Sequence, residues 1–466
     1  MGEVNKAARA AAKSRGSDFR PREEGLAAGK ALREALPRGD HARWKPLATR
    51  RDPVAVLEES NRHRVPELVP IRYGRMLRSP FTFLRGSAGL MAYDLSTTPG
   101  TGLRVQACGD CHLLNFGAFA TPERNLIFDI NDFDETLPAP WEWDLKRLCA
   151  SFAVAVRDNN LSDEEARDAA AACAGAYREH MRECSKMSPL DVWYERMDAQ
   201  TLIDLAPDEK TKKLREEAAA KARRRIGEYL VPKLTTEVDG RHRLVDQPPV
   251  LFHVAEKGAE KRFRAGVAGY RASLPDDRRV LFDRYRLEDF AAKVVGIGSV
   301  GTRCLVGLFL SPEGHSLMLQ FKEACPSVLA PHAGKSVYTN EGQRVVVGQR
   351  LMQSSSDIFL GWTRGARGRD FFGRQLRDMK FSAETAGASA ARSKIYARLC
   401  GTVLARAHAR SGDAAMISGY LGKSDAFDLA MGEFALAYAD QTIRDHAALV
   451  AAVKAGRIEA LVEEDL

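Results

Sequence analysis

The chain has 466 residues, of which 45% are hydrophobic and 28% charged, and a formal net charge of +8. It is long enough for two or three domains or one large two-lobed enzyme. These values exclude a fibrous or largely disordered protein, and the absence of any run of about 18 apolar residues argues against a membrane span. The amino terminus lacks the apolar segment of a secretion signal, and the eight cysteines lack the spacing of a disulfide framework, so we expect a cytoplasmic protein with free thiols.

Residues 1–50 form a basic, Ala-rich segment with 12 Lys/Arg against 6 Asp/Glu. Such an arm is able to touch nucleic acid or anionic lipid, but no motif that reads a nucleic-acid groove accompanies it. We therefore expect a mobile, solubilising arm and do not expect nucleic-acid binding.

The following segment combines a helix with an arginine- and aromatic-rich stretch. The apolar spacing predicts a helix from Pro53 to His63 and a strand from Leu103 to Ala107. Between them, the guanidinium groups of Arg72, Arg75 and Arg85 suit a phosphorylated or acidic substrate. They suit equally a structural role that ties the arm to the core, and the sequence leaves both interpretations open.

The most distinctive motif follows this strand. Residues 108–117 read CGDCHLLNFG, in which Asp110 and Asn115 are five residues apart, and Asp132 follows a second predicted strand, Asn125 to Ile130. This arrangement is typical of magnesium-dependent phosphoryl transfer. One Asp addresses the attacking hydroxyl, while the Asn and the second Asp hold the metal against the phosphates.

Other residues of this motif are open to more than one interpretation. His112 is expected to brace the loop through hydrogen bonds rather than to act as a base. Asp129 and Asp134 are metal ligands, neighbours of the metal ligands, or charges of a surface turn. Cys108 and Cys111 form a C-x-x-C pair, but no second pair with the spacing of a zinc site follows, so phosphoryl transfer is favoured.

The rest of the chain alternates between helical and strand-like patterns. The expected helices are 143–159, 162–186, 208–228 and 338–353, the expected strands lie within 278–325 and at 371–377, and helical spacing returns from 389 to 458. We therefore divide the chain into a basic arm (1–50), the catalytic-loop part of a helical lobe (51–237), a β-rich lobe (238–388) and a helical segment that completes the helical lobe (389–466).

The β-rich lobe contains a glycine motif, Gly296, Gly298 and Gly301, between two apolar strands. A dinucleotide-binding fingerprint would need a helix after the last glycine, whereas residues 304–310 read as a strand. We therefore predict a hairpin in which the glycines let backbone amides approach the phosphates of a nucleotide. The next alternating strand carries Lys322, which suits binding of the α- and β-phosphates.

The expected partner of Lys322 is Glu341, because it opens the helix that follows this strand. Glu323 is adjacent to the lysine in the sequence, and Gln343 and Gln349 are further candidates.

Two families share these features. Asp110-x-His112-x-x-Asn115 resembles the catalytic loop of aminoglycoside-phosphotransferase-like and protein-kinase-like enzymes. Asp132-Phe133-Asp134 resembles their metal-binding D-F-G, and Asp144 resembles the helix aspartate that follows it. The chain also resembles an uncharacterised bacterial family, domain of unknown function 2252, over nearly its whole length beyond residue 50. Segments 72–86, 109–117, 129–147 and 404–413 carry that second resemblance.

The order of the motifs departs from that of an ordinary kinase, where the glycine loop and the lysine come first. Residues 399–408 resemble the helix that normally leads into the catalytic loop, yet that loop lies almost 300 residues upstream. The simplest reconciliation is a circularly permuted, two-lobed kinase-like α+β fold, because a site is defined in space rather than by chain order. Residues 390–410 are then expected to pack beneath Asp110 to Asn115.

The resemblance implies ATP and Mg²⁺ as ligands and a phosphotransferase that acts on an unidentified hydroxyl of a small molecule or protein. Asp110 would orient or deprotonate the acceptor. Asn115, Asp132 and Asp134 would hold Mg²⁺, and Lys322 would bind the phosphates beneath the glycine hairpin.

Three alternatives stay open. They are a nucleotide-binding pseudokinase with a regulatory or scaffolding role, a nucleotidyl (AMP) transferase on the same fold, and a metal-dependent hydrolase built from the carboxylates and His112. A shared nucleotide site requires the glycine hairpin and Lys322 to lie within about 15 Å of Asp110 and Asp132, because one triphosphate has to bridge them.

Overall fold

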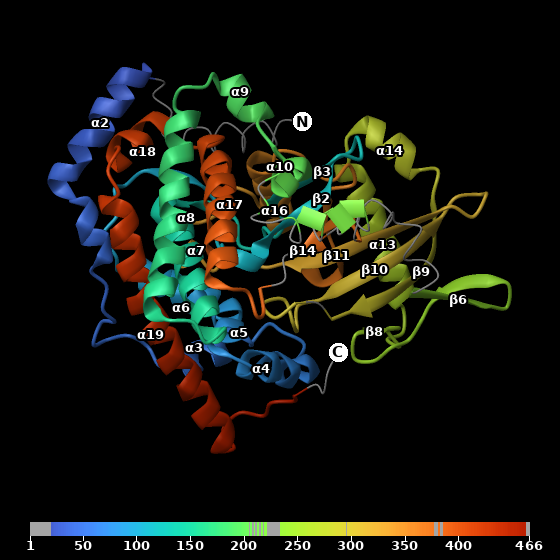
Figure 1. The fold of residues 1–466 in the computed structure, drawn as a ribbon. Coiled ribbons are helices and arrows are strands. Elements are labelled where there is room, and N and C mark those ends of the chain that lie inside the picture. The colour runs from blue at the N-terminus through green and yellow to red at the C-terminus, as the bar shows by residue number, and fades with distance from the viewer. Residues whose placement is uncertain are drawn as a thin grey trace.

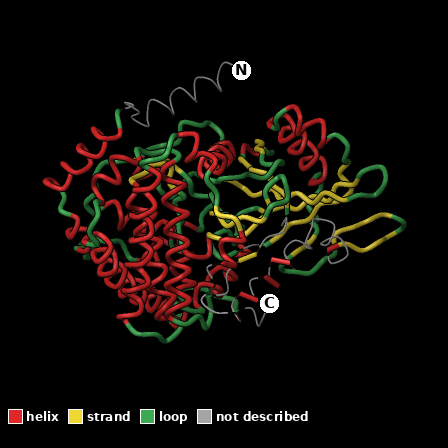
Figure 2. Tube along the Cα trace, turned by 45° about the horizontal axis from the view of Figure 1, so that its top comes forward, coloured by secondary structure: helices red, strands yellow, loops and turns green. Residues whose placement is uncertain are grey.

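The computed structural model describes residues 20–204, 234–294, 296–376 and 385–462, together with isolated positions between 206 and 220 and the pair 381–382. Long helices gather on one side of the molecule, and a six-stranded antiparallel sheet lies on the other (Figure 1). The tilted view in Figure 2 shows the same division. This mixture of helices and a largely separate antiparallel sheet agrees with the predicted α+β class.

Four long helices and one short helix form the core of the helical side. They are α7 (Trp141–Asp158), α8 (Asp163–Cys184), α17 (Ala390–Ala409), α18 (Ala414–Leu421) and α19 (Ala426–Lys454). Ser162 opens α8 with a capping box to Glu165, which satisfies backbone donors that a helix start leaves unpaired. A Cβ on Gly401 would lie 2.2 Å from the backbone oxygen of Cys173, so α17 and α8 approach as closely as only glycine allows. The helices predicted at 143–159, 162–186 and within 389–458 are confirmed.

Part of the predicted mobile arm is folded. Helix α2 (Arg22–Ala35) and a 3-10 helix (Arg38–Ala42) follow the undescribed residues 1–19, and α2 packs against α18. Small residues allow this contact: a Cβ on Gly29 would lie 2.0 Å from the backbone oxygen of Met416. The expectation of a mobile arm is therefore wrong for residues 22–42, because a glycine-faced helix packs there.

Four short helices lead from this segment to the 108–117 motif. They are α3 (Pro53–Ser60), α4 (Val69–Leu77), α5 (Pro80–Gly86) and α6 (Ala88–Ser96). The motif itself lies between short antiparallel strand pairs, β1 with β4 and β2 with β3. Their bounds are β1 Arg104–Ala107, β2 Phe116–Ala120, β3 Leu126–Ile130 and β4 Leu137–Pro140. The predicted helix from residue 53 and the strands at 103–107 and 125–130 are confirmed.

The larger sheet has the strand order β12-β13-β11-β10-β9-β8. Its strands are β8 (Leu251–Phe252), β9 (Arg286–Lys293), β10 (Cys304–Leu310), β11 (Ser316–Ala324), β12 (Gly361–Arg364) and β13 (Asp370–Gln375). Because β9 and β10 pair antiparallel and directly follow one another, the glycine motif is the loop of a hairpin, as predicted. A separate small hairpin consists of β6 (Thr235–Val238) and β7 (Arg241–Leu244).

Helices flank this sheet on both sides. Phe321 of β11 packs edge-on against Tyr270 of α13 (Ala259–Ser273), with ring centroids 5.0 Å apart. Its neighbour Lys322 points to the opposite face, because successive strand residues alternate. Helix α16 (Glu341–Met352) contacts β11, β12 and β13 and also β1 and α17, so it lies between the sheet and the helical side.

The strands predicted from residue 278 begin later in the structure, at Arg286 of β9. Residues Asp276–Phe282 form helix α14 rather than a strand, because two acidic residues in its first turn favour a helix amino terminus and Phe282 packs against Tyr270. The helix predicted at 338–353 is confirmed as α16, and the strand predicted at 371–377 is confirmed as far as Gln375. Residue 377 and most of the helix predicted at 208–228 lie outside the described residues. Among the described helices, none combines the length with the apolarity that crossing a bilayer requires.

Candidate functional site

The loop of residues 108–115 is held by buried side chains of the helical side. Its backbone turns sharply at Gly109, where φ is +90° and a Cβ would lie 2.4 Å from the backbone oxygen of Glu135. Asp144, in the first turn of α7, accepts hydrogen bonds from the backbone N–H groups of Cys108 (2.6 Å) and Gly109 (2.9 Å). The site therefore has a fixed backbone on the helical side.

Helix α17 completes this support. His408 Nε2 lies 3.2 Å from Asp144 Oδ2, and the hydroxyl of Tyr177 lies 2.9 Å from His408 Nδ1. Farther along the helix, Tyr396 donates its hydroxyl hydrogen to the backbone oxygen of Leu113 at 2.8 Å. Residues 390–410 thus pack beneath the loop, as expected, although almost 300 residues separate the two segments in the chain.

Asp110 is joined to a buried cation. Its Oδ1 accepts a hydrogen bond from Arg147 Nε at 2.7 Å, and the Asp110 side chain keeps 22% exposure. Burial raises the pKa of Asp110 to about 6, although Arg147 opposes that shift. A carboxylate in this state is ionised at neutral pH and can still exchange a proton, which suits a group that orients an acceptor hydroxyl.

His112 and Asn115 are both largely buried within the loop. His112 Nε2 lies 3.9 Å from Asp110 Oδ2, and burial lowers the pKa of His112 well below its usual range, with Arg85 and Arg147 adding to the effect. The imidazole is therefore neutral, and its buried Nδ1 has no hydrogen-bond partner among the described residues, so bracing through hydrogen bonds stays a prediction. The side-chain amide of Asn115 donates to the backbone oxygen of Asp110, and the residue is only 7% exposed.

Lys322 lies against the two aspartates of the D-F-D segment. Its Nζ is 2.5 Å from Asp134 Oδ2 and 3.6 Å from Asp132 Oδ1. Burial disfavours the charge of Lys322, but Asp132 and Asp134 outweigh it and raise the pKa of this lysine. The carboxylates keep 35% and 28% exposure, whereas the lysine keeps 3%. A buried cation therefore meets a partly exposed acidic pair.

The glycine hairpin contacts the same group of residues. Ser299 Oγ lies 3.2 Å from Asp134 Oδ2, and a Cβ on Gly298 would lie 4.0 Å from Asp110 Oδ2. Gly296 and Gly301 have φ of +64° and +86°, which bend the loop toward the helical side. The hairpin, Lys322 and the two aspartate motifs are thus in direct contact, well inside the distance that a shared nucleotide site requires.

The predicted partner of Lys322 was wrong. Glu341 pairs with Arg344 within the first turn of α16, and Asp132 and Asp134 pair with Lys322 instead. The reason is that Arg344 lies three residues after Glu341 on the same face of α16. The guanidinium of Arg344 also donates to the backbone oxygens of Asp134 (3.0 Å) and Thr136 (2.7 Å), so α16 fixes the D-F-D segment through its backbone.

Asp129 has a structural position. It is 1% exposed, its Oδ1 pairs with Arg406, and its Oδ2 accepts hydrogen bonds from the backbone and hydroxyl of Ser354. These contacts occupy both oxygens, so Asp129 belongs neither to a surface turn nor to a group of open metal ligands. By contrast, Asp134 Oδ1 is a buried oxygen with no hydrogen-bond partner among the described residues. A free carboxylate oxygen beside Asp132 fits a Mg²⁺ ion, which prefers hard oxygen ligands.

The three arginines of residues 72–85 have different roles. Arg72 is buried and donates to the backbone oxygen of Gly86, so it ties α4 to α5. Arg75 donates to the backbone oxygen of Gly296 in the glycine hairpin at 2.6 Å. Arg85 lies close enough to Asp110 and Asp132 for both to act on its pKa, which burial lowers. Neither predicted role, binding a substrate or tying the arm to the core, accounts for all three arginines. Arg75 and Arg85 lie at the site, whereas Arg72 is remote from it.

Three further residues of the site were not predicted from the sequence: Arg147, Arg344 and Glu135. Burial raises the pKa of Glu135 to about 7, and its Oε2 accepts a hydrogen bond from the backbone of Val328 at 2.7 Å. A signal existed only for Arg147, which lies three residues after Asp144 and so shares its helix face. The other two depend on contacts between segments distant in the chain.

A cavity of about 390 Å³ lies on the other face of the sheet. Aromatic side chains line it, including Phe263, Phe290, Phe321 and Phe371. Phe321 alternates with Lys322 along β11, so this cavity lies apart from the carboxylates. Cationic side chains, including Arg262 and Lys293, also line this cavity, so the polar site described above differs from it by its aspartates.

One comparison with known proteins found a match, and it covers most of the described residues. A family model described as "Uncharacterized protein conserved in bacteria (DUF2252)" matches residues 64–452, which include both aspartate motifs, the glycine hairpin, Lys322 and α17. No curated protein and no solved structure matches the chain. Because the matched region covers most of the sequence, the chain belongs to this bacterial family, domain of unknown function 2252.

Proposed function

We propose that this protein is an ATP- and Mg²⁺-dependent phosphotransferase with a circularly permuted, kinase-like arrangement of two lobes. The observation that carries the proposal is the position of Lys322 Nζ, 3.6 Å from Asp132 and 2.5 Å from Asp134, beneath the glycine hairpin. Phosphoryl transfer needs a lysine for the phosphates, carboxylates for the metal and a carboxylate for the acceptor within one triphosphate length. This set of contacts supports all three requirements.

The roles follow from charge and exposure. Asp110 would orient the acceptor hydroxyl, because its carboxylate is partly exposed and its pKa of about 6 leaves it ionised at neutral pH. Asp132, Asp134 and Asn115 would hold Mg²⁺, which would neutralise charge on the transferring phosphoryl group. Lys322 would exchange part of its contact with the aspartates for contact with the phosphates. Arg85, beside Asp110 and Asp132, would add positive charge on the acceptor side.

The permuted order of the lobes is supported by the packing of α17. In the proposed arrangement, helix α17, which carries His408, supports the catalytic loop from beneath through Asp144 and Leu113. The sheet with the glycine hairpin lies between the two helical segments in the chain, and α16 bridges it to the helical side.

The first test is binding of ATP in the presence of Mg²⁺, measured by calorimetry on the full chain. Lys322→Ala should weaken binding by about 10- to 100-fold, because a charge-assisted contact is lost. Lys394→Ala is the matched control, since this lysine is 52% exposed on α17 and pairs with Asp168. Wild-type protein that does not bind ATP, or equal binding by the Lys322→Ala variant, would contradict the proposal.

The second test separates the reaction types. ATP labelled at the γ-phosphate should lose its label to water or to a hydroxyl acceptor, and Asp110→Asn should suppress this loss while Mg²⁺-ATP binding persists. Transfer of label from the α-phosphate instead would identify a nucleotidyl transferase. The metal-dependent hydrolase receives less support, because Asp129 is committed to Arg406 and Ser354.

A nucleotide-binding pseudokinase is the second candidate, and one observation favours it. Asp110 forms a charged pair with Arg147, whose side chain is 2% exposed, and this pairing reduces the basicity of the carboxylate. Binding of Mg²⁺-ATP without release of either label would identify this function. Arg147→Met would then test whether the ion pair is what suppresses turnover.

A further inference from the structure

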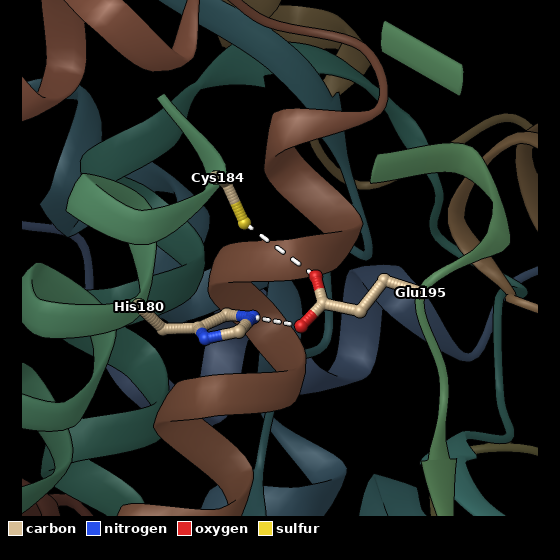
Figure 3. Close-up of side chains that lie close together, drawn as sticks. All are labelled: His180, Cys184 and Glu195. Carbon is tan, nitrogen blue, oxygen red and sulfur yellow. Dashed lines mark hydrogen bonds and ion pairs between the residues drawn. The ribbon is translucent and has the colours of Figure 1, made fainter. Parts of the chain in front are cut away.

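A second cluster of chemically competent side chains lies outside the proposed nucleotide site. His180 and Cys184 are four residues apart on the last turns of α8, so they share one face of the helix. Glu195 follows helix α9 (Pro189–Tyr194) and reaches back to them. Figure 3 shows the imidazole and the thiol both pointing at the carboxylate of Glu195.

The three ligand atoms lie close enough together to share one metal ion. His180 Nε2 lies 3.0 Å from Glu195 Oε1, and Cys184 Sγ lies 3.7 Å from Glu195 Oε2. One ligand atom from each residue lies within 4.8 Å of the other two. Tetrahedral zinc with bonds of about 2.0–2.3 Å separates its ligand atoms by roughly 3.3–3.8 Å. Small side-chain adjustments would therefore bring all three atoms onto one ion.

We propose that His180, Cys184 and Glu195 bind a zinc ion, with a solvent molecule as the fourth ligand. The proposal is independent of the proposed phosphotransferase activity, because none of these residues contacts the nucleotide site. Imidazole with thiolate is a ligand set that selects borderline metals such as zinc over Mg²⁺ or Ca²⁺, which prefer oxygen. Among the described residues, this is the group of three or more His, Cys, Asp or Glu side chains that meets the distance requirement.

Charge and access agree with this assignment. A thiolate and a carboxylate together match the two positive charges of zinc. The side chains of His180 and Glu195 keep 17% and 24% exposure, so an ion can reach the site from solvent. Cys184 is 2% exposed and would lie on the inner side. Three protein ligands with one open position is the composition of zinc sites that retain a water molecule.

The ion would link the end of α8 to the segment that follows α9. Glu195 lies two residues before strand β5 (Met197–Asp198), which pairs with β3 at Phe128 and Ile127. β3 carries Asp129, the partner of Arg406 in α17. Zinc would therefore connect the end of α8, through β5, to β3, the strand that leads into the D-F-D segment. The free energy of zinc binding would add to the stability of the folded protein.

Cobalt(II) gives a direct test, because it substitutes for zinc and produces a sulfur-to-metal charge-transfer band when a thiolate binds. The full chain, stripped with a chelator, should bind one equivalent of Co²⁺ with this band and with tetrahedral d–d absorption, and Zn²⁺ should displace it. Cys184→Ser should abolish the charge-transfer band. Cys325→Ser is the matched control, since Cys325 is the exposed thiol, and it should leave the band unchanged.

Glu195→Gln keeps the size of the side chain and should weaken Zn²⁺ binding by at least about tenfold. This variant also protects the test if Cys184→Ser does not fold, which circular dichroism would reveal. A wild-type protein without the thiolate band, or a band that survives Cys184→Ser, would overturn the proposal. Unchanged Zn²⁺ affinity in Glu195→Gln would overturn the three-ligand assignment. ATP binding should be unaffected in each variant, so failure here is distinct from failure of the proposed function.

Discussion

The two halves of the candidate site are held in different ways. The loop of residues 108–115 is fixed by buried side chains, above all Asp144 and His408, which are 2% and 0% exposed. The glycine hairpin, residues 296–303, combines buried anchors at Ile297 and Val300 with less buried contacts from Arg75 and Ser299. Local stability follows the density of buried contacts, so we expect the hairpin to open more readily than the loop. A site that admits and releases a nucleotide would benefit from this difference.

The largest expected effect comes from breaking the buried half. Asp144→Ala would leave the backbone N–H groups of Cys108 and Gly109 and the side chain of His408 without their acceptor. Orphaned buried donors and a broken buried pair cost roughly 3–5 kcal/mol together. We therefore expect the free energy of unfolding to fall by about that amount, measured by urea denaturation.

Asp168→Ala is the control for this substitution, because Asp168 lies on α8 with a 58% exposed side chain and pairs with Lys394. An exposed pair contributes about 0–1 kcal/mol. Equal losses of stability in the two variants would show that the buried network does not distinguish the loop from the rest of the molecule.

Glu135 lies where the two halves meet, and it makes stability depend on pH. Burial raises its pKa to about 7 from an ordinary value of 4.5, so the folded protein binds this proton more tightly than the unfolded chain does. The resulting stabilisation is complete below about pH 4.5 and is lost as the pH rises to about 7. Glu135→Gln cannot ionise, so its stability relative to the wild type should rise by on the order of 2 kcal/mol across this range.

Parallel urea titrations of both proteins at several pH values would measure this difference. The other titrating groups cancel in the comparison, provided that the variant keeps the hydrogen bond that Val328 donates at 2.7 Å. A difference in stability that stays constant between pH 4.5 and 7 would show that burial does not raise the pKa of Glu135.

The buried half was also the more predictable half. The spacing of Asp110 and Asn115 is local, and the helices that support the loop have clear apolar periodicity and capping residues, as at Ser162. The hairpin around Gly298 was also predicted from a local pattern, because two β-rich stretches flank the glycines. Its closeness to Asp110 could be inferred only from the resemblance, since about 190 residues separate them.

Ion-pair partners were predicted poorly, for a physical reason. Glu341 had a suitable position in the sequence, but Arg344 lies one helical turn away and takes its carboxylate, leaving Lys322 to Asp132 and Asp134. Charge partners depend on which groups become buried together, and no local pattern encodes that. The same limit applies to helix α2, whose packing could not be predicted from a local pattern. It depends on a close approach between Gly29 and Met416, which are nearly 390 residues apart in the chain.

The smallest expected effect concerns the hairpin itself. Arg75→Ala removes the 2.6 Å hydrogen bond to the backbone oxygen of Gly296, which is exposed to solvent, so the free energy of unfolding should change by about 1 kcal/mol or less. Hydrogen exchange should nevertheless accelerate at residues 296–303 and not at residues 108–115, because only the hairpin loses an anchor. Equal acceleration in both segments would mean that loop and hairpin open as one unit. The expected difference in local stability between the loop and the hairpin would then be absent.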